Sequence, residues 1–231
     1  MTTMETDTHT YLLPNGAKVY DIPQHDENGV ANIEWLCLRA GRLTGSRMKD
    51  AMDRTAKGAS SAKRTSYLWQ LVQETLTGRP APAEFVNDAM RHGTATEPFA
   101  AIHYQDERGV LLDHVGLIIH PTIDRIAYSP DGLVGEDGLW EAKCPTSQTM
   151  LQWLVGVGIP EQHIPQLNLA LSVTGRDWID FMAYDPRLPE GYDRLIIRHH
   201  RDEAAIATVE REALQFLAEV DQILEDLKNR F

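Results

Sequence analysis

The sequence predicts one α/β domain in which helices flank a central mixed sheet. Short runs of β-forming residues occupy the middle of the chain, over 115–119, 125–128 and 139–143, with Pro, Asp and Gly between them. Helical spacing of apolar residues precedes these runs, and an amphipathic pattern closes the chain. No linker is visible in the 231 residues, so we expect an N-terminal extension over 1–31 and one folded domain over 32–231.

The N-terminal half is expected to form a hairpin followed by helices. Asn-Gly between short apolar runs is the usual signal for a two-residue hairpin turn, and Gly or Pro breaks separate the helical patterns. In chain order, the signals are Asn15-Gly16, a helical pattern from Asn32 that breaks at Ala40-Gly41 and resumes at Thr44 or Ser46, and helical spacing over 67–76.

A further helical pattern runs over about 83–104. Gly93 interrupts it, and Pro98 fits best in a first turn that begins near Thr96, because proline lacks the N–H that a helix interior requires. We therefore expect an interrupted helix in this region.

Helices and strands are expected to follow the β-type runs. The first helix contains Trp153, and the closing helix has apolar residues at three- and four-residue spacings. The remaining elements are a helix over 164–173 and strands over 178–184 and 194–199.

Composition excludes several classes of protein. Apolar residues make up 42% and charged residues 24%, which is too polar for a membrane span. The N-terminus lacks a basic segment followed by an apolar one, so we expect a cytoplasmic protein. Neither Cys37 nor Cys144 belongs to a CxxC pair, so no zinc or iron–sulfur site is expected.

Charge is unevenly distributed along the chain, whose net charge is −12. Residues 39–64 contain eight basic and two acidic side chains, whereas residues 202–226 contain eight acidic side chains and one Arg. A basic patch of this kind can meet a polyanion while the remaining surface repels it, which suits a clamp or a ring. The alternative is a solvated helix face at each end of the chain.

The most informative segment is a bent hairpin over 128–143. Gly135 and Gly138 bracket a turn that folds the strand of Glu141 back beside Asp131. Side chains alternate along a strand, so Glu141 and Lys143 share a face. Two carboxylates without a His or Cys partner favour Mg²⁺ or Mn²⁺ between them.

Other groups in this segment fit the same metal chemistry. The carbonyl of Ala142 is available as a further ligand, and Lys143 would orient or help to deprotonate a metal-bound water that attacks a phosphodiester. The alternative interpretation is an ordinary solvent-facing hairpin with a surface Glu-x-Lys alternation.

An ordered set of short motifs resembles the phage-type exonuclease and recombinase family represented by lambda exonuclease, also called YqaJ. Its signature is a PD-(D/E)xK variant, and the family has the restriction-endonuclease-like fold. The departures are Gly45, where the family often has Ala, and the N-terminal extension. The matching blocks are 38–46, Gly93 with Glu97, 129–133, 141–145, Gln166 with Val173-Thr174, and 183–187.

The resemblance implies a two-metal active centre. Asp131, Glu141 and the carbonyl of Ala142 would hold Mg²⁺, for which Mn²⁺ would substitute, and Lys143 would act on the water. Glu97 would complete the second metal site. The alternative for Glu97 is structural, because Thr94-x-x-Glu97 also fits a helix capping box.

The resemblance also implies a pocket for a terminal 5′-phosphate. Its residues would be Arg39, Ser46, Ser129 and Gln166, which offer a guanidinium fork, hydroxyls and an amide. Met90 would be the apolar residue that separates the terminal base pairs. Without the resemblance these residues would be interpreted as surface, cap or core positions.

The function implied is a magnesium-dependent 5′-to-3′ exonuclease on linear double-stranded DNA, which releases mononucleotides and leaves a 3′ overhang for recombination. The family forms toroidal homotrimers, with a single-strand annealing protein as an expected partner and a phage or prophage as the expected source. The basic stretch would line the ring and the acidic helix would face outward. Two alternatives are a structure- or site-specific endonuclease on the same fold and a catalytically inactive DNA-binding module.

Overall fold

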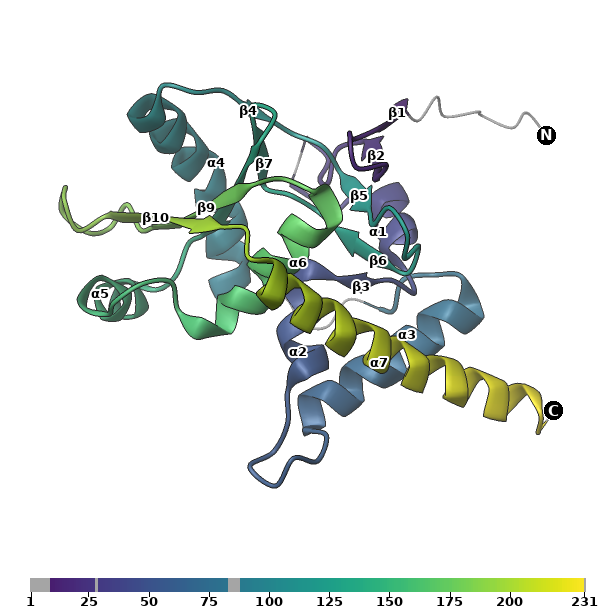
Figure 1. The fold of residues 1–231 in the computed structure, drawn as a ribbon. Coiled ribbons are helices and arrows are strands. Elements are labelled where there is room, and N and C mark those ends of the chain that lie inside the picture. The colour runs from purple at the N-terminus through teal and green to yellow at the C-terminus, as the bar shows by residue number, and fades with distance from the viewer. Residues whose placement is uncertain (1–8, 28, 83–87, 231) are drawn as a thin grey trace.

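The computed structural model describes residues 9–27, 29–82 and 88–230, and within them helices pack around two five-stranded sheets (Figure 1). The first sheet has the order β1 (His9–Leu12), β2 (Lys18–Asp21), β5 (Leu117–Ile119), β6 (Ile126–Tyr128) and β3 (Leu43–Thr44). The second has the order β10 (Arg194–His200), β9 (Trp178–Tyr184), β8 (Gly138–Lys143), β7 (Gly132–Val134) and β4 (Leu112–Asp113).

Both sheets are mixed, which confirms the predicted fold class. The pairs β3–β6 and β8–β9 are parallel, and the other pairs are antiparallel. The strands divide into two sheets where one was expected. Consecutive strands β6 and β7 belong to different sheets, because Ser129-Pro130-Asp131 separates them and Pro130 has no N–H to donate to a strand ladder.

The helices occupy the regions that the apolar spacing predicts, with shifted ends. α6 is buried along most of its length and packs on β5, β6, β9 and α7, so it fills the space between the two sheets. The elements are α1 (Ile33–Arg39), η1 (Gly45–Arg47), α2 (Met48–Met52), α3 (Ala62–Thr77), α4 (Asp88–Arg108), α5 (Ser147–Val155), η2 (Glu161–His163), α6 (Ile164–Thr174) and α7 (Glu203–Lys228).

The N-terminal hairpin is confirmed, with a longer loop than the Asn-Gly signal predicts. β1 and β2 are antiparallel, and Gly16 donates its N–H to the carbonyl of Leu13 in a turn where Gly16 has φ 88°. β2 also pairs with β5. The hairpin therefore forms the edge of the first sheet.

Helix α4 is continuous through Gly93 and Pro98, so the expected interruption is wrong. Ala100 and Tyr104 are fully buried on α4, and the helix packs on β8 and β9. Tertiary packing of this kind outweighs the cost of a proline in the helix interior. Because Thr94 lies inside α4, it is not an N-cap, and the capping-box interpretation of Glu97 is excluded.

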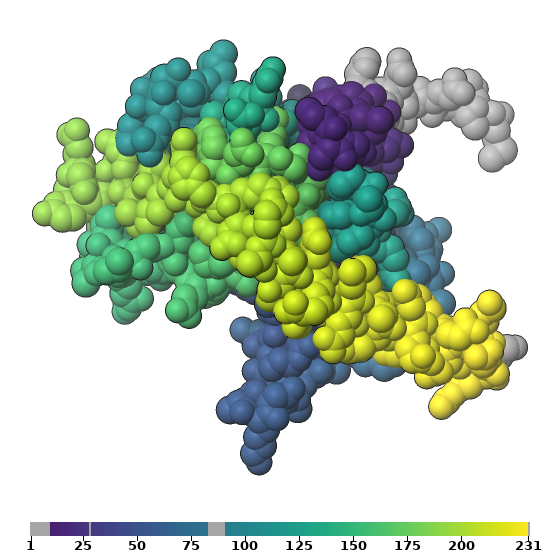
Figure 2. Space-filling model, in the orientation of Figure 1, coloured from purple at the N-terminus to yellow at the C-terminus, as the bar shows by residue number. Residues whose placement is uncertain are grey.

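The acidic helix α7 packs against α2 and α3, which carry part of the basic segment, so the two charged segments are neighbours in the fold. Arg64 is 1% exposed and forms a bidentate pair with Glu219, at 2.6 and 2.7 Å. Arg54 pairs with Glu212. Figure 2 shows that the segment between α2 and α3, which carries exposed Lys57, projects from the body of the molecule.

No helix within the described ranges is long and apolar enough to cross a bilayer.

Acid stability provides a test of the packing around η2. His163 is 8% exposed and contacts the rings of Trp153 and Phe181. Burial, with Lys143 and Lys49 nearby, lowers the pKa of His163 to about 3. The unfolded chain binds a proton near pH 6.5 and the folded chain does not, so stability is lost as the pH falls through this window.

We predict that His163→Phe flattens the dependence of unfolding free energy on pH between pH 6 and 4, by up to about 1.4 kcal/mol per pH unit. Urea denaturation at several pH values measures this slope. His200→Phe, at an exposed position of β10, is the control that should keep the wild-type slope. An unchanged slope in His163→Phe would contradict the packing argument.

Candidate active site

The β7–β8 hairpin brings Asp131 beside the strand of Glu141, as its sequence predicts. Gly132 pairs with Trp140, and Gly135 makes the turn with φ 53°. Asp131 directly precedes Gly132, and its Oδ2 accepts a hydrogen bond from the N–H of Ala142 at 2.8 Å. The sheet ladder therefore fixes the separation of the two acidic residues.

Glu141 lies in the interior and is 1% exposed. Its Oε2 accepts a hydrogen bond from the Tyr128 hydroxyl at 2.8 Å. Its Oε1 accepts from both Lys143 Nζ and Gln166 Nε2. Residues from three elements, β6, β8 and α6, thus converge on one buried carboxylate, which excludes the alternative of a surface Glu-x-Lys alternation.

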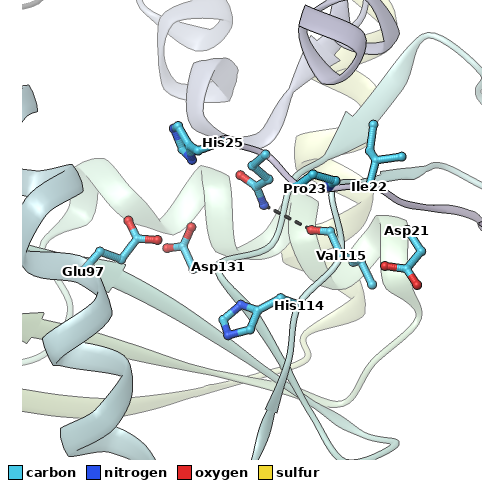
Figure 3. A pocket seen from close by; sticks show the side chains of 9 residues that line it. Asp21, Ile22, Pro23, His25, Glu97, His114, Val115 and Asp131 are labelled. Carbon is cyan, nitrogen blue, oxygen red and sulfur yellow. Dashed lines mark hydrogen bonds between the residues drawn. The ribbon is translucent and has the colours of Figure 1, made fainter. Parts of the chain in front are cut away.

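Glu97 reaches the centre from α4, where its carboxylate points toward that of Asp131, and both residues line a cavity of about 470 Å³ (Figure 3). The N-terminal segment 21–25 forms another wall of this cavity. Gln24 fixes that wall, because its Nε2 donates to the carbonyls of Val115, at 3.2 Å, and Pro130, at 2.7 Å. His25 and His114 also line the cavity.

The carboxylates are held in an unfavourable environment for anions. Burial, followed by the negative charges of Glu141 and Glu97, raises the pKa of Asp131 well above its usual range. Burial and Glu141 also raise the pKa of Glu97. Burial lowers the pKa of Lys143, but Glu141 and Asp131 outweigh it and raise that pKa to about 12, so Lys143 is an ammonium ion.

This donor set fits a hard divalent cation. Glu97, Asp131 and Glu141 supply only oxygen, which Mg²⁺ and Mn²⁺ prefer. The N–H of Ala142 points to Asp131, and in a strand the carbonyl of the same residue points to the same side. Among the described residues, no group of three His, Cys, Asp or Glu side chains is already arranged around a metal position. The Glu141 carboxylate instead accepts hydrogen bonds from protein side chains such as Tyr128.

A second cluster forms around Arg39 at the end of α1. Arg39 Nη1 donates to Ser129 Oγ at 2.7 Å, and its guanidinium lies 4.3 Å from the ring centroid of Trp35. Trp35 Nε1 donates to the same Ser129 Oγ at 3.1 Å. Ser46 is exposed and lines the same cavity of about 190 Å³ as Arg39. Burial lowers the pKa of Arg39, since the surroundings disfavour its charge.

The five residues assigned to substrate binding separate into three groups. Arg39 and Ser129 are in contact, and Ser46 shares the Arg39 cavity. Gln166 instead contacts Glu141 in the carboxylate centre. Met90 lies on α4, but the side chain of Met90 is not among those that the structure describes.

Sequence reasoning missed Tyr128, His25 and His114. Tyr128 ends a short β-type run, and a tyrosine in a strand is usually only a packing residue. The two histidines have no metal-ligand spacing in the sequence, and both are exposed side chains that line the cavity of Glu97 and Asp131. Only the fold brings them there.

Comparisons with known proteins agree with this geometry. Residues 34–177 match the model of the YqaJ-like viral recombinase domain. The alkaline exonuclease LHK-Exo from Laribacter hongkongensis is 39% identical, with a TM-score of 0.79 over 86% of this chain and 97% of that one, and its complex with dAMP matches equally. A phage-related exonuclease from Haemophilus somnus shares the fold at 12% identity, with a TM-score of 0.61 over 80% of this chain and 96% of that one. No curated protein matches the sequence significantly.

Thermal stability tests the repulsion among the carboxylates. We predict that Asp131→Asn raises the melting temperature by roughly 2–4 °C in EDTA, because it removes one of the mutually repelling carboxylates from the cluster. Divalent cations should stabilise the wild type and should have less effect on Asp131→Asn, since ligand binding stabilises only a competent site.

Differential scanning fluorimetry with EDTA, Mg²⁺ or Mn²⁺ measures both effects. Glu136→Gln, at an exposed position of the β7–β8 turn, is the control that should behave as wild type in each condition. A lower melting temperature for Asp131→Asn in EDTA would show that repulsion does not dominate at this site.

Proposed function

The chain belongs to the family of YqaJ-like viral recombinase domains, and from this premise we propose that it is a magnesium-dependent exonuclease acting on linear double-stranded DNA. It degrades one strand in the 5′-to-3′ direction, releases mononucleotides and leaves a 3′ overhang for recombination. The observation that carries the proposal is the Asp131–Glu141–Lys143 centre around the buried Glu141 carboxylate, with Glu97 pointing toward Asp131. The alkaline exonuclease relative supports the reaction class, and its complex with dAMP fits release of mononucleotides.

Each residue of the centre has a chemical role in this proposal. Asp131, Glu97, Glu141 and the Ala142 carbonyl would hold Mg²⁺, which would supply Lewis-acid activation of the phosphodiester and of water. Lys143 is protonated, so it donates hydrogen bonds that orient the attacking water and stabilise negative charge on the phosphate. Its second possible role, as a base, is disfavoured by its raised pKa.

The Arg39 cluster is suited to a terminal 5′-phosphate. Guanidinium and hydroxyl groups bind phosphate oxygens with directed hydrogen bonds. Ser129 and Asp131 flank Pro130, so one short turn fixes the distance between the proposed phosphate pocket and the proposed metal site. This arrangement favours cleavage at a fixed distance from an end, which is the behaviour of an exonuclease.

We also propose a toroidal homotrimer with a single-strand annealing protein as a partner. A ring would retain a duplex despite a net charge of −12. Because Arg54 and Arg64 of the basic segment pair with α7, exposed lysines such as Lys57 and Lys63 are the better candidates for facing DNA. Monomers on sizing at low salt, together with strictly distributive digestion, would contradict the ring.

The reaction itself is tested with a linear duplex labelled on one strand. With Mg²⁺ the wild type should release label from the 5′ end first, and Lys143→Ala should lose activity by about 10²-fold or more because charge stabilisation at the phosphate is lost. Lys228→Ala, at the exposed end of α7, should retain activity. A covalently closed plasmid should stay intact; its cleavage would favour the endonuclease alternative.

End recognition is tested separately with 5′-phosphate and 5′-hydroxyl duplexes. We predict that Arg39→Ala slows digestion of the 5′-phosphate substrate by about 10-fold or more, equivalent to roughly 1.4 kcal/mol, and has little effect on the 5′-hydroxyl substrate. Arg211→Ala, at an exposed position of α7, is the control that should digest both substrates as the wild type does. Equal loss on both substrates would mean that Arg39 supports the fold and does not recognise the end phosphate.

A further inference from the structure

Glu141 is oriented by donors that the proposed reaction does not itself require. We infer that Tyr128 is a positioning residue, whose hydroxyl fixes the Glu141 carboxylate for the cation, and that Gly45 is the complementary position that makes room for the Tyr128 ring. This inference rests on the proposed function, since it concerns the same centre.

The Tyr128 ring has no free space around it. Tyr128 is the last residue of β6, is 1% exposed and belongs to the main hydrophobic core. A Cβ atom at Gly45 would lie 2.9 Å from Cδ2 of the Tyr128 ring, closer than a carbon–carbon contact allows. Because the ring is packed in a core, an alanine at position 45 would displace it, and the hydroxyl would move with it.

Gly45 also packs beside Gln166, the second uncharged residue that donates a hydrogen bond to Glu141. The Cβ at position 45 would lie 3.6 Å from Cγ of Gln166, an ordinary van der Waals contact. Gln166 is 9% exposed and donates from the first turn of α6 to Glu141 Oε1. Gly45 therefore packs against both Tyr128 and Gln166, each of which holds one oxygen of Glu141.

The distribution of donors determines which oxygen of Glu141 is left for a cation. A carboxylate offers about four lone-pair sites, two on each oxygen. Lys143 and Gln166 occupy both sites on Oε1, whereas Tyr128 occupies one on Oε2. The remaining site is on Oε2, and the Tyr128 hydroxyl fixes the direction in which it points.

Cation binding measured without DNA tests this role. Loss of a group that orients a metal ligand typically costs about 10- to 100-fold in affinity. We expect Tyr128→Phe, which keeps the ring, to weaken Mn²⁺ binding by about 10-fold in titration calorimetry while its melting temperature in EDTA stays near the wild-type value. Tyr192→Phe, at an exposed position in the loop between β9 and β10, should bind Mn²⁺ as the wild type does.

A size-complementation cycle tests the role of Gly45. Gly45→Ala should weaken Mn²⁺ binding and lower the melting temperature when Tyr128 is present. In the Tyr128→Ala background, adding Gly45→Ala should change neither quantity further, because the ring that it displaces is gone. Wild-type affinity in both Tyr128→Phe and Gly45→Ala would overturn the inference and leave the proposed function standing. Absence of Mn²⁺ and Mg²⁺ binding by the wild type would overturn both.

Discussion

Negative charge is crowded at the junction of the two sheets, where three carboxylates meet. Asp131 and Glu141 come from a hairpin and Glu97 from α4, in a region where burial raises the pKa values of Asp131 and Glu97. Like charges at such a position are costly unless a cation or donors compensate them. The surrounding elements supply the donors: β6 provides Tyr128 and α6 provides Gln166. The donors that the fold supplies thus offset only part of the negative charge at this site.

Hydrogen bonds that offset the negative charge are unequally distributed among the carboxylates of the centre. Glu141 receives hydrogen bonds from three side chains, including the Lys143 ammonium. Asp131 accepts a hydrogen bond from a backbone N–H, and the Glu97 carboxylate points toward it in the cavity that both residues line. The balance of charge is therefore poorest between Glu97 and Asp131, which is where a divalent cation would contribute most. The N-terminal segment closes this cavity through Gln24, so residues that the sequence presents as an extension belong to the site's wall.

Local patterns predicted the parts of this site that lie close together in sequence. The two-residue alternation of Glu141 and Lys143 and the glycine turn before them are properties of one hairpin, so spacing was sufficient to place them beside Asp131. Glu97 is more than 30 residues away, and only the resemblance linked it to the centre, because its spacing also fitted a helix cap. Helix α4 continues through Pro98 because tertiary packing stabilises it, and local sequence patterns do not reveal tertiary packing. Tyr128 and Gln166 meet Glu141 only because β6 and α6 pack together. The division into two sheets depends on a break at Pro130, which the pattern of β-forming residues does not reveal.

The central claim is that the Glu97–Asp131–Glu141 cluster binds a divalent cation. The most direct measurement is anomalous diffraction from crystals of the protein grown with millimolar Mn²⁺, collected so that manganese gives the strongest signal. We predict an anomalous peak within coordination distance of Asp131, about 2.2 Å, that disappears in crystals of Asp131→Asn. A peak on other residues, or none at this cluster in crystals of a protein that hydrolyses DNA with Mn²⁺, would contradict it.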